Sequence, residues 1–127
     1  MKVFTSIIIL LVFITTVQSQ VLPQRERAEI IDQILEERIN DLLPKLMDRV
    51  GVDMWVLIAR EYNEDPVLRT MLPSTWLNAR RRTMLVFYRD KQNNSVEKLA
   101  VARYKVGQAI DSAWDKEKEP NQWNALM

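Results

Sequence analysis

Cysteine and histidine are both absent from the 127 residues of this chain. Without cysteine the chain can form no disulfide, offers no thiol nucleophile and supplies no thiolate to a metal. Without histidine it lacks the most common general base and the most common ligand of transition metals. Only two glycines occur, Gly51 and Gly107, so no glycine-rich loop can surround a phosphate. These absences exclude most of the familiar kinds of catalytic site.

Residues 1–19 are typical of an export signal. Lys2 gives a positive start, residues 3–17 are almost entirely apolar, and Ser19 is a small residue where a signal peptidase reads the chain. We therefore expect cleavage after Ser19, an exported protein in the periplasm or outside the cell, and no stable membrane insertion after cleavage. An uncleaved anchor is the less favoured alternative, because the apolar run is shorter than the roughly 20 residues that span a bilayer.

The mature chain is electrically balanced. Removal of residues 1–19 takes away one lysine and no acid, so the formal balance changes from 18 basic against 17 acidic residues to 17 against 17. A neutral chain has no general attraction for nucleic acid or for an anionic membrane, so neither is an expected partner. With 47% hydrophobic and 28% charged residues, the composition predicts one ordinary globular domain over residues 20–127.

A long helix and a buried strand are predicted in the first half of the mature chain. Residues 25–50 carry apolar side chains at helical spacing, with one broad buried stripe. Pro44 is expected to kink or divide this helix near Asn40, and Gly51 to end it. Residues 52–59 are almost wholly apolar, which predicts a strand covered on both faces, as in the centre of an α/β sheet.

The second half predicts a hairpin between shorter elements. The β-rich runs 83–88 and 96–104 are joined by a polar segment, which is the pattern of a hairpin. A short helix is expected over residues 76–82. A further helix is expected to start at Pro120 and to be truncated at Met127, which indicates the front part of a longer protein. Together these elements predict an α/β fold with a mixed β-sheet and flanking helices.

A dense polar loop follows the first predicted strand, at the kind of position where open α/β sheets bind ligands. Its residues are Arg60, Glu61, Tyr62, Asn63, Glu64 and Asp65. Two interpretations stay open: a peptide-binding cleft in which carboxylates meet a peptide ammonium, or a loop in which arginine and acids pair with each other. The alternating acids of a calcium loop are missing, which argues against a calcium or magnesium site.

Arginine and tryptophan supply the candidate contact surfaces with another domain or subunit. Arginine suits ion pairs at interfaces, but the three arginines could also form a solvated helix end. Tryptophan is enriched at interfaces, but each tryptophan could also pack within the domain. The candidates are Trp76, Arg80, Arg81, Arg82, Trp114 and Trp123. Asn93 begins a glycosylation sequon, although asparagines at a hairpin tip need no such explanation.

The order of these segments resembles a known family. After the helix come GVDMWVLIAREYNEDPVLRTMLP from Gly51, STWLNARRRTMLVFY from Ser74 and VEKLAVARY from Val96. This order resembles the N-terminal domain of exported bacterial Xaa-Pro aminopeptidases in the creatinase and prolidase superfamily. The resemblance implies a creatinase-type domain that precedes a catalytic pita-bread domain. In that second domain two aspartates, one histidine and two glutamates bind two divalent metal ions, and the enzyme cleaves the bond before a proline at position two of a peptide.

The chain itself matches none of those metal ligands, so no catalytic residue, metal ligand or cofactor is assigned to it. The resemblance implies a noncatalytic front domain that shapes substrate access and contributes subunit contacts in a homo-oligomer. Its implied partners are the missing C-terminal catalytic domain and the peptide substrate. The alternative is an autonomous exported α/β binding module that captures a small ligand or peptide at Arg60–Asp65. An independent hydrolase comes third, since carboxylates alone leave only unusual mechanisms.

Overall fold

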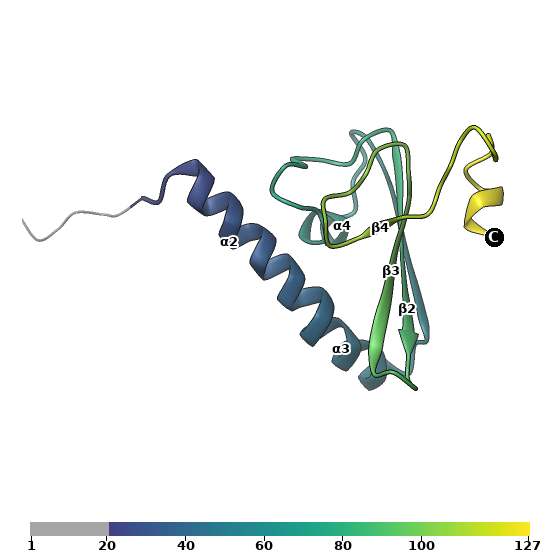
Figure 1. The fold of residues 1–127 in the computed structure, drawn as a ribbon, viewed down its shortest axis with the longest axis horizontal. Helices are drawn as coiled ribbons and strands as arrows, with labels where there is room; N and C mark the ends of the chain where they lie inside the picture. Colours follow the sequence, from purple (N-terminus) through teal and green to yellow (C-terminus); the bar gives the residue numbers. More distant parts are fainter. Residues whose placement is uncertain (1–20) are drawn as a thin grey trace, which may run out of the picture.

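The computed structural model describes residues 21–127, and the predicted export signal lies outside the described residues. The fold is mixed α/β, with a long helix on one side of a four-stranded sheet (Figure 1). No helix within residues 21–127 is long and apolar enough to cross a membrane. The elements follow in the order α2 (Gln24–Glu37), η1 (Arg38–Leu42, a π-helical turn), α3 (Leu43–Val50), β1 (Met54–Arg60), α4 (Pro66–Thr70), β2 (Arg82–Asp90), β3 (Ser95–Ala102), β4 (Asp111–Ser112) and η2 (Asn124–Leu126, a 3-10 turn).

The long helix is interrupted by one π-helical turn, and the prediction that Pro44 divides it near Asn40 is confirmed. Pro44 has no N–H, so the carbonyl of Asn40 loses its usual partner four residues ahead. The chain widens directly before the proline, where the N–H of Leu43 donates to the carbonyl of Arg38, five residues back. Gly51 ends the helix with φ at 70°, a left-handed conformation that glycine adopts without steric cost.

The sheet has the strand order β1-β2-β3-β4. The first two pairings are antiparallel and the third is parallel. The predicted hairpin is confirmed, because β2 and β3 pair in register from Asp90 opposite Ser95 to Thr83 opposite Ala102. The mixed sheet of the predicted α/β class therefore consists of an antiparallel meander with one short parallel strand added.

The core lies between the long helix and the inner face of the sheet. Four buried residues of the helix recur at four-residue intervals and so form one stripe. They pack with inner-face residues of the strands and with buried residues of the connecting loops. The main members are Leu35, Ile39, Leu43 and Met47 from the long helix, Leu57, Leu85, Phe87 and Ala100 from the strands, Leu68 from α4, and Leu72, Trp76, Val106 and Ile110 from the loops.

The predicted burial of β1 on both faces, as in a central strand, is wrong. Among the described strands β1 lies at the edge of the sheet and pairs only with β2. On its outer face Met54, Val56 and Ile58 are 55%, 36% and 42% exposed, whereas Leu57 and Ala59 on the inner face are buried. A continuous apolar run shows that both faces are apolar, but which neighbours cover them depends on strand order, which local sequence does not specify.

Two of the predicted helices are also wrong. Residues 76–81 form bends and irregular chain rather than a helix, and Arg82 already begins β2. The end of the chain forms only the turn η2 in place of an α-helix from Pro120. The side chain of Gln122 donates to the carbonyls of Arg82 and Val101, which ties this segment to the sheet. A helix of about two turns is marginal without packing, so these contacts decide the conformation.

Candidate functional site

The polar loop turns back tightly at the end of β1. The N–H of Arg60 donates to the carbonyl of Asn63 at 3.3 Å, and the N–H of Asn63 donates to the carbonyl of Arg60 at 2.9 Å. Between them Tyr62 has φ at 68°, a left-handed conformation that is rare for a bulky residue. Its side chain is 91% exposed. The turn therefore presents the phenol of Tyr62 to solvent.

The three carboxylates of the loop accept hydrogen bonds from backbone N–H groups. Glu61 accepts from Arg81 at 3.3 Å, Glu64 from Ala79 at 2.8 Å, and Asp65 from Val67 at the start of α4 at 2.7 Å. Their main partners are thus backbone groups, and the one arginine pairing in the loop is Glu64 with Arg69 at 3.8 Å. Each carboxylate retains free lone pairs, because it can accept about four hydrogen bonds.

Tyr62 stands between two surface hollows. One, of about 470 Å³, is lined by Tyr62, Glu64, Pro66, Arg69, Leu77 and Asn78. The other, of about 320 Å³, is lined by Arg60, Glu61, Tyr62, Arg81 and Arg82. The structure thus brings the predicted loop together with two of the three consecutive arginines. Both hollows have a largely polar and charged lining, unlike the mostly apolar pockets that enclose small molecules. They are therefore better suited to a polar ligand.

The remaining candidate contact residues fall into separate clusters. The guanidinium of Arg80 lies 5.2 Å from the centre of the Trp76 ring, and that of Arg82 lies 5.0 Å from the centre of the Trp123 ring. Both distances are within the range of cation–π attraction. Trp76 is only 7% exposed and packs in the core, whereas Trp123 is 47% exposed. Trp114 is half-buried, and its indole N–H donates to the carbonyl of Glu119 at 2.7 Å.

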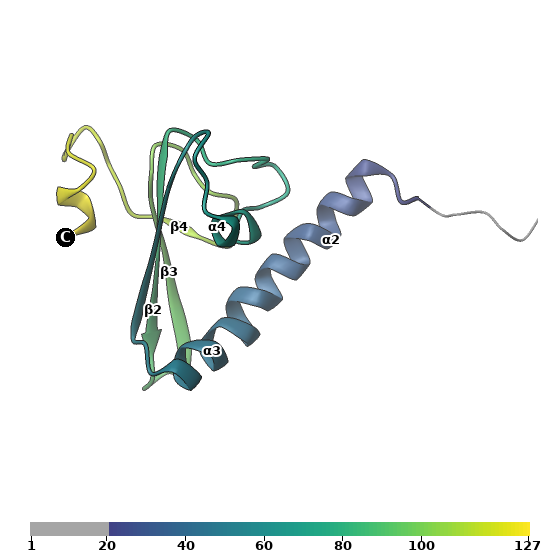
Figure 2. The ribbon, with the colours of Figure 1, turned by 180° about the vertical axis from the view of Figure 1, so that it is seen from behind.

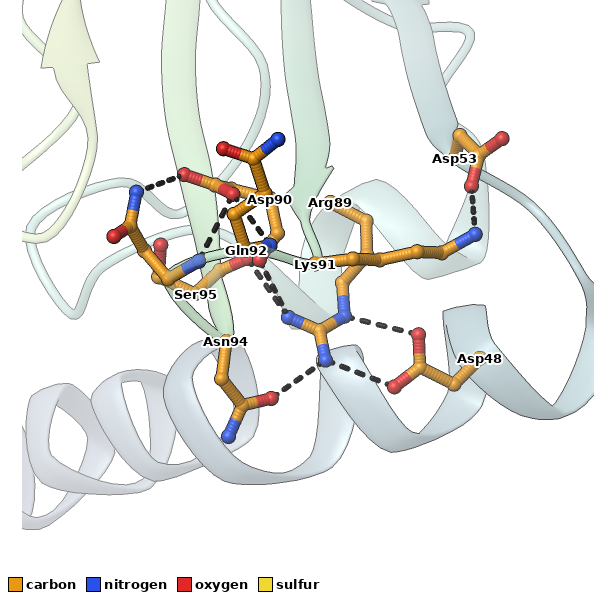
Figure 3. A network of polar contacts seen from close by, with 9 residues as sticks. Asp48, Asp53, Arg89, Asp90, Lys91, Gln92, Asn94 and Ser95 are labelled. Carbon is orange, nitrogen blue, oxygen red and sulfur yellow. Dashed lines mark hydrogen bonds and ion pairs between the residues drawn. The ribbon is translucent and has the colours of Figure 1, made fainter.

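An ion pair between the buried Arg89 and the half-exposed Asp48 joins the sheet to the helix (Figure 3), and sequence reasoning missed it. The guanidinium donates to the Asp48 carboxylate through Nε at 3.0 Å and through Nη2 at 2.9 Å. It also donates to the side chain of Asn94 and to the carbonyls of Asp90 and Ser95, so it closes the β2–β3 turn. Side chains alternate between the two faces of a strand, so Arg89 falls on the inner face with Leu85 and Phe87. That alternation could have indicated from the sequence that Arg89 is buried.

This ion pair shifts the pKa of both partners. The hydrogen bonds from Arg89, and secondarily its charge, hold the pKa of Asp48 below its ordinary value. The same hydrogen bonds raise the pKa of Arg89. Both shifts favour the charged forms, so the pair is fully ionised at neutral pH. Together with the bonds to Asn94, Asp90 and Ser95, the ion pair uses every N–H group of the Arg89 guanidinium. This indicates a structural role in the fold.

The free energy of unfolding is expected to depend on the Asp48 carboxylate in acid. Because the pKa of Asp48 is lower in the folded than in the unfolded protein, its contribution is complete above about pH 4 and is lost as the pH falls through the folded-state pKa. The variant Asp48→Asn should therefore be clearly less stable than wild type at pH 7, with a difference that shrinks towards pH 3. Urea unfolding of both proteins at several pH values measures this.

Asp41→Asn is the matched control, since Asp41 is an exposed acid of the same helix. It should track wild type at every pH. A difference between wild type and Asp48→Asn that stays constant from pH 7 to pH 3 would contradict the assigned role.

The outer face of the sheet is only partly covered. Figures 1 and 2 show the C-terminal segment on the side of the sheet opposite the long helix. Near that segment Met84 and Val101 are buried, although the register places them on the outer face. On the same face Met54, Val56, Ile58 and Tyr88 are 36–55% exposed. The helix adds a second set of exposed apolar residues, namely Ile30, Ile31, Ile34, Leu42, Leu46 and Val50.

Comparisons with known proteins return nothing similar. No protein-family model matches the chain, and searches of curated proteins and of solved structures find no match. Within residues 21–127 no group of three or more acidic, histidine or cysteine side chains is placed to hold a metal ion. The family resemblance therefore rests on the quoted residues and their order alone.

Proposed function

We propose that this chain is a noncatalytic accessory domain that docks against a larger catalytic domain. The proposal rests on the apolar part of the outer sheet face that residues 21–127 leave uncovered. Met54, Val56 and Ile58 follow one another on the outer face of β1, and the register places Tyr88 opposite Met54, so the exposed side chains are contiguous, whereas Val86 opposite Val56 is buried. Contiguous exposed apolar patches on folded domains mark interaction sites more often than single exposed residues do.

The family resemblance supplies the identity of the proposed partner. In an exported Xaa-Pro aminopeptidase-like metallopeptidase, the catalytic domain would cover the outer sheet face, hold the two metal ions and carry out the hydrolysis. The loop Arg60–Asp65 would then lie at the rim of the substrate entrance. There the free lone pairs of Glu61 and Glu64 are suited to accept hydrogen bonds from a peptide ammonium. An exported location and subunit contacts belong to the same proposal.

The DNA that follows the codon for Met127 tests the identity of the partner. The proposal expects an in-frame continuation that encodes one histidine and four carboxylates spaced as metal ligands. A genuine stop, with no such sequence close behind it in any frame, would contradict the proposal. It would leave the alternative of a separate binding module, which the two hollows beside Tyr62 favour.

In the longer protein, Ile58→Asp tests the docking surface. The substitution places a charge within the proposed contact, so we expect hydrolysis of Xaa-Pro peptides to fall by about tenfold or more. The interdomain linker should also become more sensitive to limited proteolysis. Ile30→Asp is the control, because Ile30 is equally exposed at 42% but lies on α2, on the opposite side of the sheet. Equal effects of the two substitutions would refute docking through the outer face.

A further inference from the structure

Within residues 21–127 strand β1 has an open edge, and the hydrogen-bonding groups along it can be identified one by one. The carbonyl of Asp53 accepts from the N–H of Arg89 at 2.8 Å, and the N–H of Glu61 donates to the carbonyl of Arg81 at 2.7 Å. In an antiparallel ladder the hydrogen-bonded pairs alternate along the strand. Odd-numbered residues of β1 therefore direct their backbone groups towards β2. Even-numbered residues direct theirs towards the open edge.

Both ends of this edge are already occupied. The backbone groups of Arg60 are paired with Asn63, and the N–H of Val52 donates to the carbonyl of Met47 at 3.0 Å. The open stretch thus consists of Met54, Val56 and Ile58. It contains neither proline nor a charged residue, the features by which proteins usually protect an edge strand from pairing.

We propose that a second copy of this chain pairs its own β1 antiparallel to this edge, with the twofold axis at Val56. In this register Met54 lies opposite Ile58 of the second copy, and Val56 lies opposite itself. Every open N–H and C=O of the three residues then finds a partner, and the two sheets join into one. A shift of two residues in either direction would require the backbone groups of Arg60 or the N–H of Val52, which are occupied as described above.

The side chains on both faces agree with a second copy as the partner. On the outer face Met54 and Ile58, which are 55% and 42% exposed, would cover each other. On the inner face the copy brings its Leu57 beside Trp55. There an apolar hollow of about 320 Å³ borders the start of β1, lined by Leu43, Leu46, Met47, Val50, Val52 and Trp55. Apolar side chains therefore meet on both sides of the new strand pair.

This inference does not rest on the proposed function. Docking of a catalytic domain uses the outer sheet face as a whole, including Tyr88, whereas pairing with a second copy is made by the backbone at the sheet edge and adds from the outer face the contact of Met54 with Ile58. A monomeric result for residues 20–127 would leave the docking proposal intact, because docking is tested in the longer protein. Failure of docking would likewise leave the strand pairing intact.

Analytical ultracentrifugation of residues 20–127 tests the pairing. Because the open stretch is short, we expect a concentration-dependent dimer with a dissociation constant of roughly 10–100 µM. Val56→Pro removes an N–H that faces the edge and spares the bonds of β1 to β2, as prolines on edge strands do. It should raise the dissociation constant at least about tenfold, with an unchanged circular dichroism spectrum. Val56→Thr keeps the N–H and should dimerise like wild type.

A wild-type chain that stays monomeric up to about 1 mM would overturn the inference, even if its edge captures an extended peptide. A Val56→Pro variant that dimerises like wild type would overturn it as well.

Crosslinking provides a second test that keeps the inference falsifiable if Val56→Pro does not fold. The natural chain has no cysteine, so Val56→Cys introduces a single thiol on the proposed axis. A short bismaleimide should link two copies at this position in high yield. Leu77→Cys, at an 85% exposed loop position, should give only background crosslinking. Equal yields at the two positions would overturn the inference.

Discussion

Phe87→Ala is expected to lower the free energy of unfolding by about 3–5 kcal/mol, which is a large part of the total stability of a small domain. The Phe87 side chain is fully buried, and β2, which carries it, pairs with strands on both sides. Its ring lies 6.2 Å from the ring of Trp55, at a tilt of 44°. Removal of the ring loses apolar burial and leaves a cavity between the sheet and the helix. Urea unfolding followed by circular dichroism measures the loss.

Tyr88→Ala is the matched control for this prediction. Tyr88 is the next residue of the same strand, but its side chain lies on the outer face and is 44% exposed. The substitution should cost about 1 kcal/mol or less, since it removes little buried area and changes strand propensity only slightly. If Tyr88→Ala destabilised the domain as much as Phe87→Ala, the assignment of the inner and outer faces would be wrong.

Gly107→Ala is expected to destabilise the domain by about 2–5 kcal/mol, through two additive causes. Gly107 has φ at 64°, where any residue with a Cβ pays about 1–2 kcal/mol. The added Cβ would also lie 2.9 Å from both Cβ and Cγ of Pro73, and the proline ring has little freedom to move. Overpacking of this kind costs about 1–3 kcal/mol. Thermal unfolding of the purified variant measures the sum.

Gly51→Ala separates the two causes. Gly51 has nearly the same backbone conformation, with φ at 70°, but no heavy atom lies within 4 Å of the position of an added Cβ. This variant should therefore lose only the backbone cost of about 1–2 kcal/mol. If both substitutions lower the free energy of unfolding equally, the contact of the added Cβ at residue 107 with Pro73 has no energetic cost. That result would refute the tight packing of residue 107 against Pro73.

The two proposed contacts place different demands on the same strand. The side chains of Met54, Val56 and Ile58 form part of the outer face, and the backbone of the same residues forms the open edge. An apolar edge strand of this kind tends to pair or aggregate unless it is covered. The two contacts together would remove both the exposed apolar face and the open edge from water.

Local sequence alone determined several elements of the fold. The helical spacing of apolar residues defined the long helix, and the missing N–H of Pro44 located its interruption. The alternation of β-rich runs around a polar segment defined the β2–β3 hairpin. These features depend on residues close together in the chain, where propensity and periodicity act directly.

Only the tertiary structure decided which surfaces are covered and which polar groups meet. The apolar run of β1 was compatible with a central strand, and strand order placed it at an open edge. Arg89 and Asp48 are 41 residues apart, so no local pattern joins them. The sequence predicts that the acids of the polar loop bind a ligand or pair with arginines. In the fold, residues 79–81 lie beside the loop, and their backbone N–H groups donate to Glu61 and Glu64. Such contacts arise from packing of distant segments, which the local pattern does not encode.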